Sequence, residues 1–248
     1  MLPTMVAVDC KGSKFLIFDK PDVISDGLRA NIGHDAWLEY YSIILVGDAK
    51  DGVILDIGSN IGTYAVPMAK VFPNIDFYAF EPQRIVFYQL CSNVILNGLE
   101  NVRPINKGLG DTTVEVEVVT PDYSIENNVG AFSLDAEVHA NYCQCTSQGK
   151  LEKIQIDRLD NYEFKNVRLI KIDVEGLELA VIQGGVETIK DNNYPPIIFE
   201  TWTAQPWYQD RRKELIAYVE SLGYHITSIG DNCIAQHTSR KVIEWANQ

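Results

Sequence analysis

From residue 53 onward, short runs of apolar, mostly β-branched residues alternate with stretches in which apolar residues recur at helical spacing. The short runs are typical of buried strands, and the helical spacing is typical of amphipathic helices. The predicted strands are 53–57, 75–80, 102–106, 112–119, 167–172, 196–199, 225–229 and 233–236. The predicted helices are 61–71, 85–96, 177–189 and 211–222. This alternation favours an α/β fold, in which a mostly parallel sheet is covered by helices on both faces.

The two ends of the chain and one internal stretch depart from this alternation. Segments 225–229 and 233–236 flank a short turn, so we expect an antiparallel pair. Residues 1–50 show only a β-like segment at 15–18 and a helical one at 36–46, and we expect them to form a cap beside the sheet. Residues 120–149 are polar and Asn-rich, which predicts loops over the carboxyl edge of the sheet. The expected organisation is a cap segment, 1–50, followed by one α/β domain, 51–248.

Composition limits the cellular location and the binding partners that we expect. A length of 248 residues with 46% hydrophobic and 22% charged residues is ordinary for one globular domain with a modest extension. The net charge of −13 argues against a general binder of nucleic acid or of anionic membranes. We expect no signal peptide and no membrane span, which together indicate a cytoplasmic protein. The five cysteines lack framework spacing, and the lone pair Cys143 and Cys145 does not predict a zinc site.

The strand predicted at 53–57 runs directly into a glycine-containing turn, D-I-G-S-N-I-G at 56–62. Gly58 and Gly62 allow tight backbone geometry and close approach of a ligand, and a following helix offers unpaired N–H groups. Asn60 stands where the dinucleotide-binding pattern has its middle glycine, which disfavours a pyrophosphate ligand. We expect the Asp56 carboxylate beside the turn, and Glu81, at the end of the next strand, as a partner for two ribose hydroxyls. Taken alone, the turn is also compatible with a purely structural role.

A second acidic run, K-I-D-V-E-G-L-E at 171–178, follows the buried strand predicted at 167–172. As acids at a helix N-terminus, Asp173 and Glu175 favour the helix dipole by about 0.3–1 kcal/mol each. Alternatively, Asp173 orients or deprotonates a substrate hydroxyl at the sheet edge. A metal held by Asp173, Glu175 and a third acid is disfavoured because the run contains no histidine, so we expect no metal.

Together these stretches resemble the FkbM-like methyltransferases, a family of Rossmann-type enzymes that use S-adenosylmethionine and mostly modify hydroxyl groups. The matching stretches are VILDIGSNIGTYA (53–65), FYAFEP (77–82), NVILNGLENV (93–102), KGLGD (107–111), LIKIDVEGLELAVIQGG (169–185) and PPIIFE (195–200). The resemblance implies a doubly wound seven-stranded sheet, mostly parallel with an antiparallel last strand. It also places the loop 107–111 near the adenine, although Lys107 stands where a small residue is more usual.

The resemblance, combined with the residue chemistry, assigns roles to individual positions. The expected contacts of S-adenosylmethionine are Glu39, Asp56, Gly58, Ser59, Asn60, Gly62, Glu81, Asp111 and Asp173. The catalytic candidates are Asp173, Glu175 and His139, and the candidates for binding the acceptor are Glu200 and Trp202.

Several of these candidate residues also have a purely structural interpretation. Glu39 either meets the methionyl ammonium or is a solvated residue on a capping helix. His139 either acts as a base or is a surface histidine. Glu200 and Trp202 either build the acceptor pocket or pack at a strand end. The polar stretch 127–133 either forms a loop near the active site, as in the family, or is a simple turn.

The sequence therefore predicts a methyltransferase that uses S-adenosylmethionine to methylate a hydroxyl of a sugar, glycan or natural product. The expected partner is a small-molecule or glycan acceptor, not a nucleic acid or a membrane. A catalytically idle cofactor-binding protein of the same fold is an open alternative. A nicotinamide-dependent oxidoreductase is disfavoured by Asn60 and by the lack of a Tyr-x-x-x-Lys pair.

Overall fold

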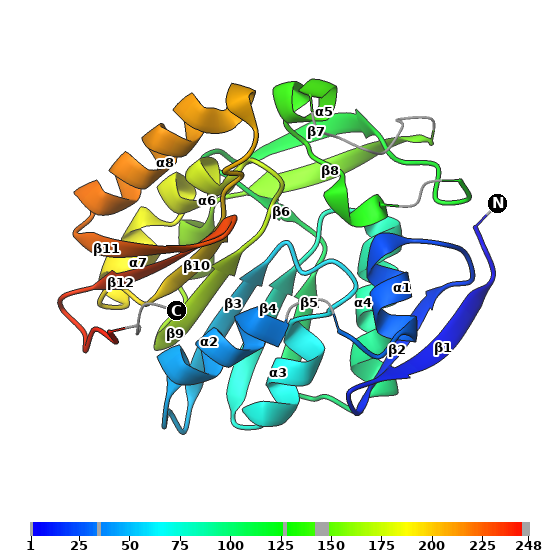
Figure 1. Ribbon diagram of the computed structural model, residues 1–248, viewed down its shortest axis with the longest axis horizontal. Helices are drawn as coiled ribbons and strands as arrows, with labels where there is room; N and C mark the ends of the chain where they lie inside the picture. The colour runs from blue at the N-terminus through cyan, green and yellow to red at the C-terminus, as the bar shows by residue number, and fades with distance from the viewer. Residues whose placement is uncertain (1, 34–35, 126–127, 142–148, 245–248) are drawn as a thin grey trace.

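The computed structural model describes residues 2–33, 36–125, 128–141 and 149–244, and its central feature is a seven-stranded sheet between two helical layers (Figure 1). The strand order is β11-β12-β10-β9-β3-β4-β5. These strands are β3 (Gly52–Ile57), β4 (Ile75–Phe80), β5 (Val102–Ile105), β9 (Val167–Ile172), β10 (Ile197–Glu200), β11 (Tyr224–Ile229) and β12 (Asn232–His237). Only β12 runs antiparallel to its neighbours β10 and β11. The predicted seven-stranded, mostly parallel sheet with an antiparallel last strand is therefore confirmed.

The order of strands reverses beside β3. The chain passes from β3 outward through β4 to β5, and later returns to the other side of β3 with β9 and then β10. Strands β3 and β9 are thus parallel neighbours, and their register places Asp56 opposite Lys171. In open α/β sheets, ligands bind outside the carboxyl ends of the strands at such a reversal. The topology alone therefore points to the carboxyl ends of β3 and β9.

Two apolar cores lie on opposite faces of the sheet. The helices of the first face are α2 (Ala36–Val46), α3 (Ala65–Val71) and α4 (Arg84–Leu96), and those of the second are α6 (Glu178–Gly184), α7 (Val186–Asp191) and α8 (Gln209–Ser221). Ile54 and Leu169 pack into the first core, whereas their chain neighbours Leu55 and Ile170 pack into the second. Successive strand residues point to opposite faces, so a strand covered on both sides is a continuous apolar run.

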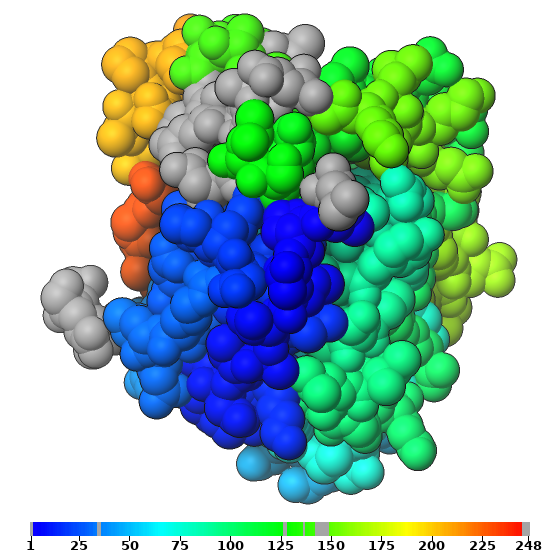
Figure 2. All heavy atoms as spheres, turned by 90° about the vertical axis from the view of Figure 1, so that its right-hand side faces the viewer, coloured from blue at the N-terminus to red at the C-terminus, as the bar shows by residue number. Residues whose placement is uncertain are grey.

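The N-terminal segment forms a separate antiparallel hairpin, β1 (Met5–Cys10) and β2 (Ser13–Phe18), followed by α1 (Val23–Arg29). This hairpin lies beside α4, on the side of the molecule that Figure 2 shows. The Leu16 N–H donates to Asn93 Oδ1 of α4 over 2.6 Å. The predicted helix 36–46 is confirmed as α2, but β1 and α1 were not predicted. A local signal for α1 exists, because the Asp22 side chain caps it by accepting from the Ser25 N–H at 3.0 Å.

A small third sheet, in the order β6-β8-β7, comprises β6 (Gly108–Leu109), β7 (Val114–Val119) and β8 (Leu151–Asp157). The sequence prediction contained β7 but missed β8. The predicted helix 177–189 is divided into α6 and α7 at Gly185. A Cβ at the neighbouring Gly184 would lie 1.8 Å from the Gly110 carbonyl oxygen, so glycine is required there. The predicted helix 61–71 begins only at residue 65.

The remaining short elements are α5 (Ala136–Asn141), η1 (Val129–Ala131), η2 (Leu159–Tyr162) and η3 (Pro206–Tyr208). Within the described ranges, every helix is too short or too polar to cross a lipid bilayer.

Candidate functional site

A cavity of about 300 Å³, here called the first cavity, lies at the carboxyl edge of the parallel strands. Neighbouring strands contribute residues where they end: Gly58 after β3, Glu81 after β4, Asp173 after β9, and Glu200 as the last residue of β10. The arrowheads of these strands point toward this edge in Figure 1, on the side where α5 lies. This volume is at the lower end of the range for small-molecule sites. The first cavity therefore occupies the reversal point that the topology indicates.

A second cavity of about 140 Å³ adjoins the first and lies under α2, where Trp37 and Leu38 line it. Four side chains line both cavities: Lys171, Asp173, Glu175 and Glu200. This shared wall gives the site two compartments that meet at the ends of β9 and β10.

The glycine turn is held by the backbone of the neighbouring strands. The N–H groups of Gly58 and Ser59 donate to the Phe80 carbonyl at 3.0 and 2.9 Å. Gly58 has a φ of +80°, and a Cβ there would lie 1.7 Å from the Asp173 carbonyl oxygen. Glycine is therefore required by the close approach of Asp173, and Gly58 also lines the first cavity. Ser59 is buried, donates from Oγ to the Asp56 carbonyl at 2.7 Å, and does not line the cavity.

Two further expected cofactor contacts lie away from both cavities. A Cβ on Gly62 would lie 2.9 Å from Leu90 Cδ1, so this glycine permits packing against α4. Asp111 is exposed, and its carbonyl accepts a hydrogen bond from Arg158. The part of its loop that reaches the first cavity is 107–109. Gly62 thus faces a helix and Asp111 faces solvent, and their expected cofactor contacts stay predictions.

Glu81 ties the turn to the end of β4. Its Oε2 accepts from the Asn60 N–H at 3.0 Å, and its Oε1 accepts from the Gln83 N–H at 2.8 Å. Burial raises the pKa of Glu81 to about 7, although these two backbone hydrogen bonds lower it. Each carboxylate oxygen keeps a further lone pair, so the group can accept additional hydrogen bonds from a ligand in the first cavity. Asn60 lines the same cavity with a φ of +50°.

Asp56 is completely buried and lines neither cavity, which does not support the expected direct contact with a ligand. Its Oδ1 lies 3.2 Å from Lys171 Nζ. Burial raises the pKa of the Asp56 carboxyl, against the Lys171 ammonium, which lowers it. Lys171 also donates to the Gly58 carbonyl at 2.7 Å and lies 3.5 Å from Asp173 Oδ2. The sequence analysis did not select Lys171; its signal is a lysine between two isoleucines at the end of a buried strand.

Asp173, Glu175 and Glu200 form an acidic group on the shared wall. One carboxylate oxygen from each lies within 4.8 Å of the others. Burial, and then the negative charges of Asp173 and of Glu178, raise the pKa of Glu200 to about 9. Three carboxylates at this spacing attract a cation, either a metal ion or a cationic group of a ligand. The expectation of no metal stays a prediction.

Glu178 supports the loop that carries these acids. It is buried, and its Oε1 accepts from the N–H groups of Val174 and Gly176 at 3.2 and 3.1 Å. Burial raises the pKa of Glu178 to about 7. Its position under the loop indicates a structural function.

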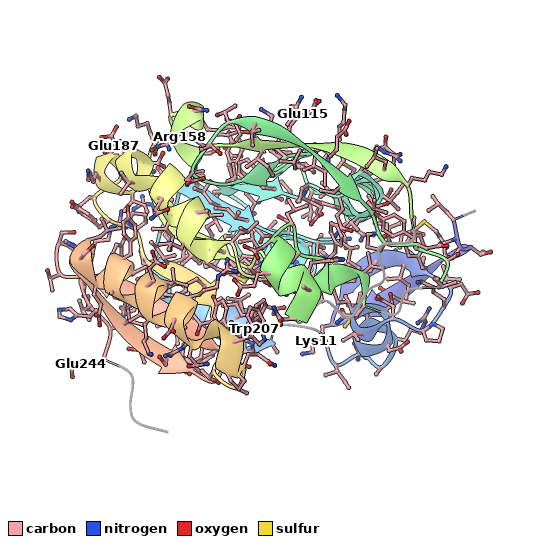
Figure 3. All side chains as sticks on the ribbon, turned by 90° about the horizontal axis from the view of Figure 1, so that it is seen from above. Lys11, Glu115, Arg158, Glu187, Trp207 and Glu244 are labelled. Atoms are coloured by element: carbon pink, nitrogen blue, oxygen red, sulfur yellow. The ribbon has the colours of Figure 1, made fainter. Side chains whose placement is uncertain are left out.

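Trp202 is buried and lines the first cavity. Its ring packs against Trp207 and Tyr208, with ring centroids 5.8 and 4.8 Å away. Trp207 lies beside the N-terminal end of α8 in Figure 3. Trp202 thus presents one edge of an aromatic cluster to the cavity, next to Glu200.

The remaining candidate residues lie at the edge of the two cavities or outside them. His139 lies on α5 and packs edge-on against Phe132, with ring centroids 5.8 Å apart; Phe132 lines the first cavity and His139 does not. Glu39 lies on α2 and lines neither cavity. The stretch 128–132 reaches the first cavity, where a Cβ on Gly130 would lie 2.5 Å from Asn60 Nδ2. Residue 127, Cys143 and Cys145 lie outside the described residues.

Comparison with known proteins places this site in a family. The family model "Methyltransferase FkbM domain" matches residues 56–226. Methyltransferase 1 of Beauveria bassiana is 28% identical over 149 residues, which are 54% of this chain and 58% of that protein. Methyltransferase sdnD of Sordaria araneosa is 25% identical over 202 residues, 70% of this chain and 74% of that protein.

A third relative is the hexuronic acid methyltransferase AglP of Haloferax volcanii, which is 26% identical over 153 residues, 61% of this chain and 57% of that protein. The chain thus spans less than two thirds of the Beauveria and Haloferax relatives. The region matched by the family model includes the ends of β3, β4, β9 and β10, which build most of the first cavity.

Proposed function

The chain belongs to the FkbM methyltransferase family, and we propose that it transfers a methyl group from S-adenosylmethionine to a hydroxyl group of a sugar, glycan or other small natural product. The observation that carries this proposal is the acidic wall shared by the two cavities. Asp173, Glu175 and Glu200 line both compartments. A donor in the first cavity and an acceptor in the second would therefore meet at the same three carboxylates.

The first cavity fits the chemistry of S-adenosylmethionine, which presents a ribose diol and two cationic groups. Glu81 offers two carboxylate oxygens where β4 ends, as a ribose diol requires. The acidic group at β9 and β10 favours a cation, because opposite charges attract strongly in a partly buried site. When bound, the cofactor supplies a methyl carbon attached to a positively charged sulfur. Residues 107–109 also line this cavity, and we place the adenine beside them.

In the proposed reaction, the acceptor oxygen forms a bond to the methyl carbon while the carbon–sulfur bond breaks. The bonding pair passes to sulfur, which leaves S-adenosylhomocysteine, and the hydroxyl proton passes to a carboxylate. Asp173 takes this proton in our proposal, because its side chain is 42% exposed and reaches both cavities. Glu200, with a pKa raised to about 9 by burial, keeps its proton near neutral pH and donates a hydrogen bond to the acceptor.

The lining also favours one class of acceptor. Trp202 in the first cavity and Trp37 in the second supply aromatic surface beside the carboxylates. Aromatic walls with a few polar groups suit a polyhydroxylated molecule, and one relative is named as a methyltransferase of a sugar acid. The Asp173 and Glu175 carboxylates favour an uncharged or cationic acceptor over an anionic one.

Titration calorimetry tests the first step of the proposal. The protein is expected to release or absorb heat on binding S-adenosylmethionine and S-adenosylhomocysteine, and NADH fluorescence is expected to stay unchanged on mixing. Absence of binding by either adenosyl ligand would refute the proposal.

A transfer assay tests the chemistry. With labelled S-adenosylmethionine and a panel of sugars and polyols, we expect an alkali-stable methyl ether. Asp173→Asn should lower transfer by about 100-fold with cofactor affinity changed much less. The control is Glu187→Gln, an exposed position on α7 at the rim of the molecule (Figure 3). Cofactor binding without transfer to any acceptor would instead indicate the catalytically idle alternative.

A further inference from the structure

Lys171 and Asp56 form a buried ion pair that the proposed reaction does not use. They lie opposite each other on the adjacent central strands β9 and β3, and their side chains are 6% and 0% exposed. Removing two charges from water is costly, and the attraction between them rarely repays that cost in stability. A pair at this position therefore calls for an explanation beyond folding.

The contacts of the Lys171 ammonium supply one. Its Nζ donates to the Gly58 carbonyl at 2.7 Å, lies 3.2 Å from Asp56 Oδ1, and lies 3.5 Å from Asp173 Oδ2. Gly58 belongs to the turn beside the proposed cofactor, and Asp173 is the proposed proton acceptor. One ammonium group thus joins the donor side of the site to the acceptor side.

A lysine at this place carries an electrostatic penalty. Its positive charge borders a cavity that, by the proposed function, holds a cationic sulfonium, and like charges repel strongly where water is scarce. Asp56 is fully buried, does not line the cavity, and pairs with Lys171 in the protein interior. The pair as a whole therefore adds no net charge, and the attraction of the acidic group for the cofactor is preserved.

We infer that Lys171 is a positioning residue, which fixes the Gly58 turn and the Asp173 carboxylate relative to each other. Asp56 is its counter-ion, and its negative charge balances the lysine charge that a cationic cofactor would otherwise meet. This inference rests on the proposed function, since it takes S-adenosylmethionine as the ligand. It also gives Asp56 a function that its full burial permits.

The test compares S-adenosylmethionine with S-adenosylhomocysteine, which lacks the sulfonium charge. In Asp56→Asn the lysine charge is no longer balanced, so affinity for S-adenosylmethionine should fall by about tenfold more than affinity for S-adenosylhomocysteine. In the double variant Lys171→Met/Asp56→Asn the charge is gone, and the ratio of the two dissociation constants should return to within about twofold of wild type. Both affinities of the double variant should still be weaker, because the Gly58 carbonyl has lost its donor.

The outcomes separate this inference from the proposed function. If wild type binds neither ligand, the proposed function fails. If wild type binds both, and Asp56→Asn weakens both equally, the counter-ion function is overturned while the proposed function stands. A double variant that binds both ligands as tightly as wild type overturns the positioning function. Thermal unfolding establishes that each variant is folded. Should Asp56→Asn not melt cooperatively, the double variant tests the positioning function: weaker binding of both ligands supports it, and binding as tight as in wild type overturns it.

Discussion

Replacing Glu178 with glutamine should change how the stability of the protein depends on pH. The carboxyl is 1% exposed, and its Oε1 accepts from the N–H groups of Val174 and Gly176. Burial raises its pKa to about 7, from an ordinary value of 4.5. Glutamine has nearly the same shape, keeps an oxygen for both N–H groups, and never ionises.

The size and the sign follow from proton linkage. A difference of 2.5 pH units between 7 and 4.5, at 1.36 kcal/mol per unit, corresponds to about 3 kcal/mol. Because the folded protein holds this proton more tightly than the unfolded chain, the stabilisation is fully present below pH 4.5 and is lost as the pH rises through about 7. The free energy of unfolding of Glu178→Gln, relative to wild type, should thus increase by about 3 kcal/mol over that range, most of it between pH 5 and pH 8.

Urea unfolding followed by tryptophan fluorescence at pH 5, 6, 7 and 8 measures this difference. Glu187→Gln is the matched control, because the Glu187 side chain is 65% exposed and pairs with Lys190. The control should follow wild type at every pH. If Glu178→Gln also stays within about 0.5 kcal/mol of a constant offset from wild type, burial does not raise this pKa and the reasoning is refuted.

Three further predictions concern the site. Affinity for S-adenosylhomocysteine should rise about tenfold from pH 6 to pH 8, because burial raises the pKa of Glu81 to about 7 and the ionised carboxylate accepts from the ribose hydroxyls. Calorimetry on wild type checks this, and the affinity of Glu81→Gln should not change with pH. Gly58→Ala should cost at least about 3 kcal/mol of stability, whereas Gly98→Ala, whose Cβ would meet nothing within 4 Å, should cost about 1 kcal/mol; thermal unfolding of both variants compares them. Trp202→Ala should lower the free energy of unfolding by about 3 kcal/mol, because it leaves a gap beside Trp207, as urea unfolding will show.

The elements with strong local signals were predicted closely. The strands at 75–80 and 167–172 match β4 and β9 residue for residue, because each is a short apolar run between clear turn signals. The antiparallel pairing of β11 with β12 follows from a short connection, which is also local. Missing from the prediction were β1, α1 and β8. The signals of α1 and β8, a capping aspartate and a weak alternation, are small beside those of the buried strands.

For the site, the prediction was sound where a residue ends a strand. Glu81 and Asp173 line the first cavity because the carboxyl ends of parallel strands meet at one edge, whatever the distance along the chain. It did not specify side-chain orientation: Asp56 is completely buried, and Asp111 is exposed. A motif specifies which residues are near a turn, but it does not specify which way each side chain points.

The amino-acid sequence by itself determined the order of strands and helices, the glycine turn and the acidic residues that follow the strands, because these depend on residues close together in the chain. Only the tertiary structure decided that Lys171 meets Asp56 and Gly58, more than 110 residues away, and that Gly58 must be glycine to admit the Asp173 backbone. These contacts depend on the register of β3 against β9, which is set when the two apolar cores close on the faces of the sheet.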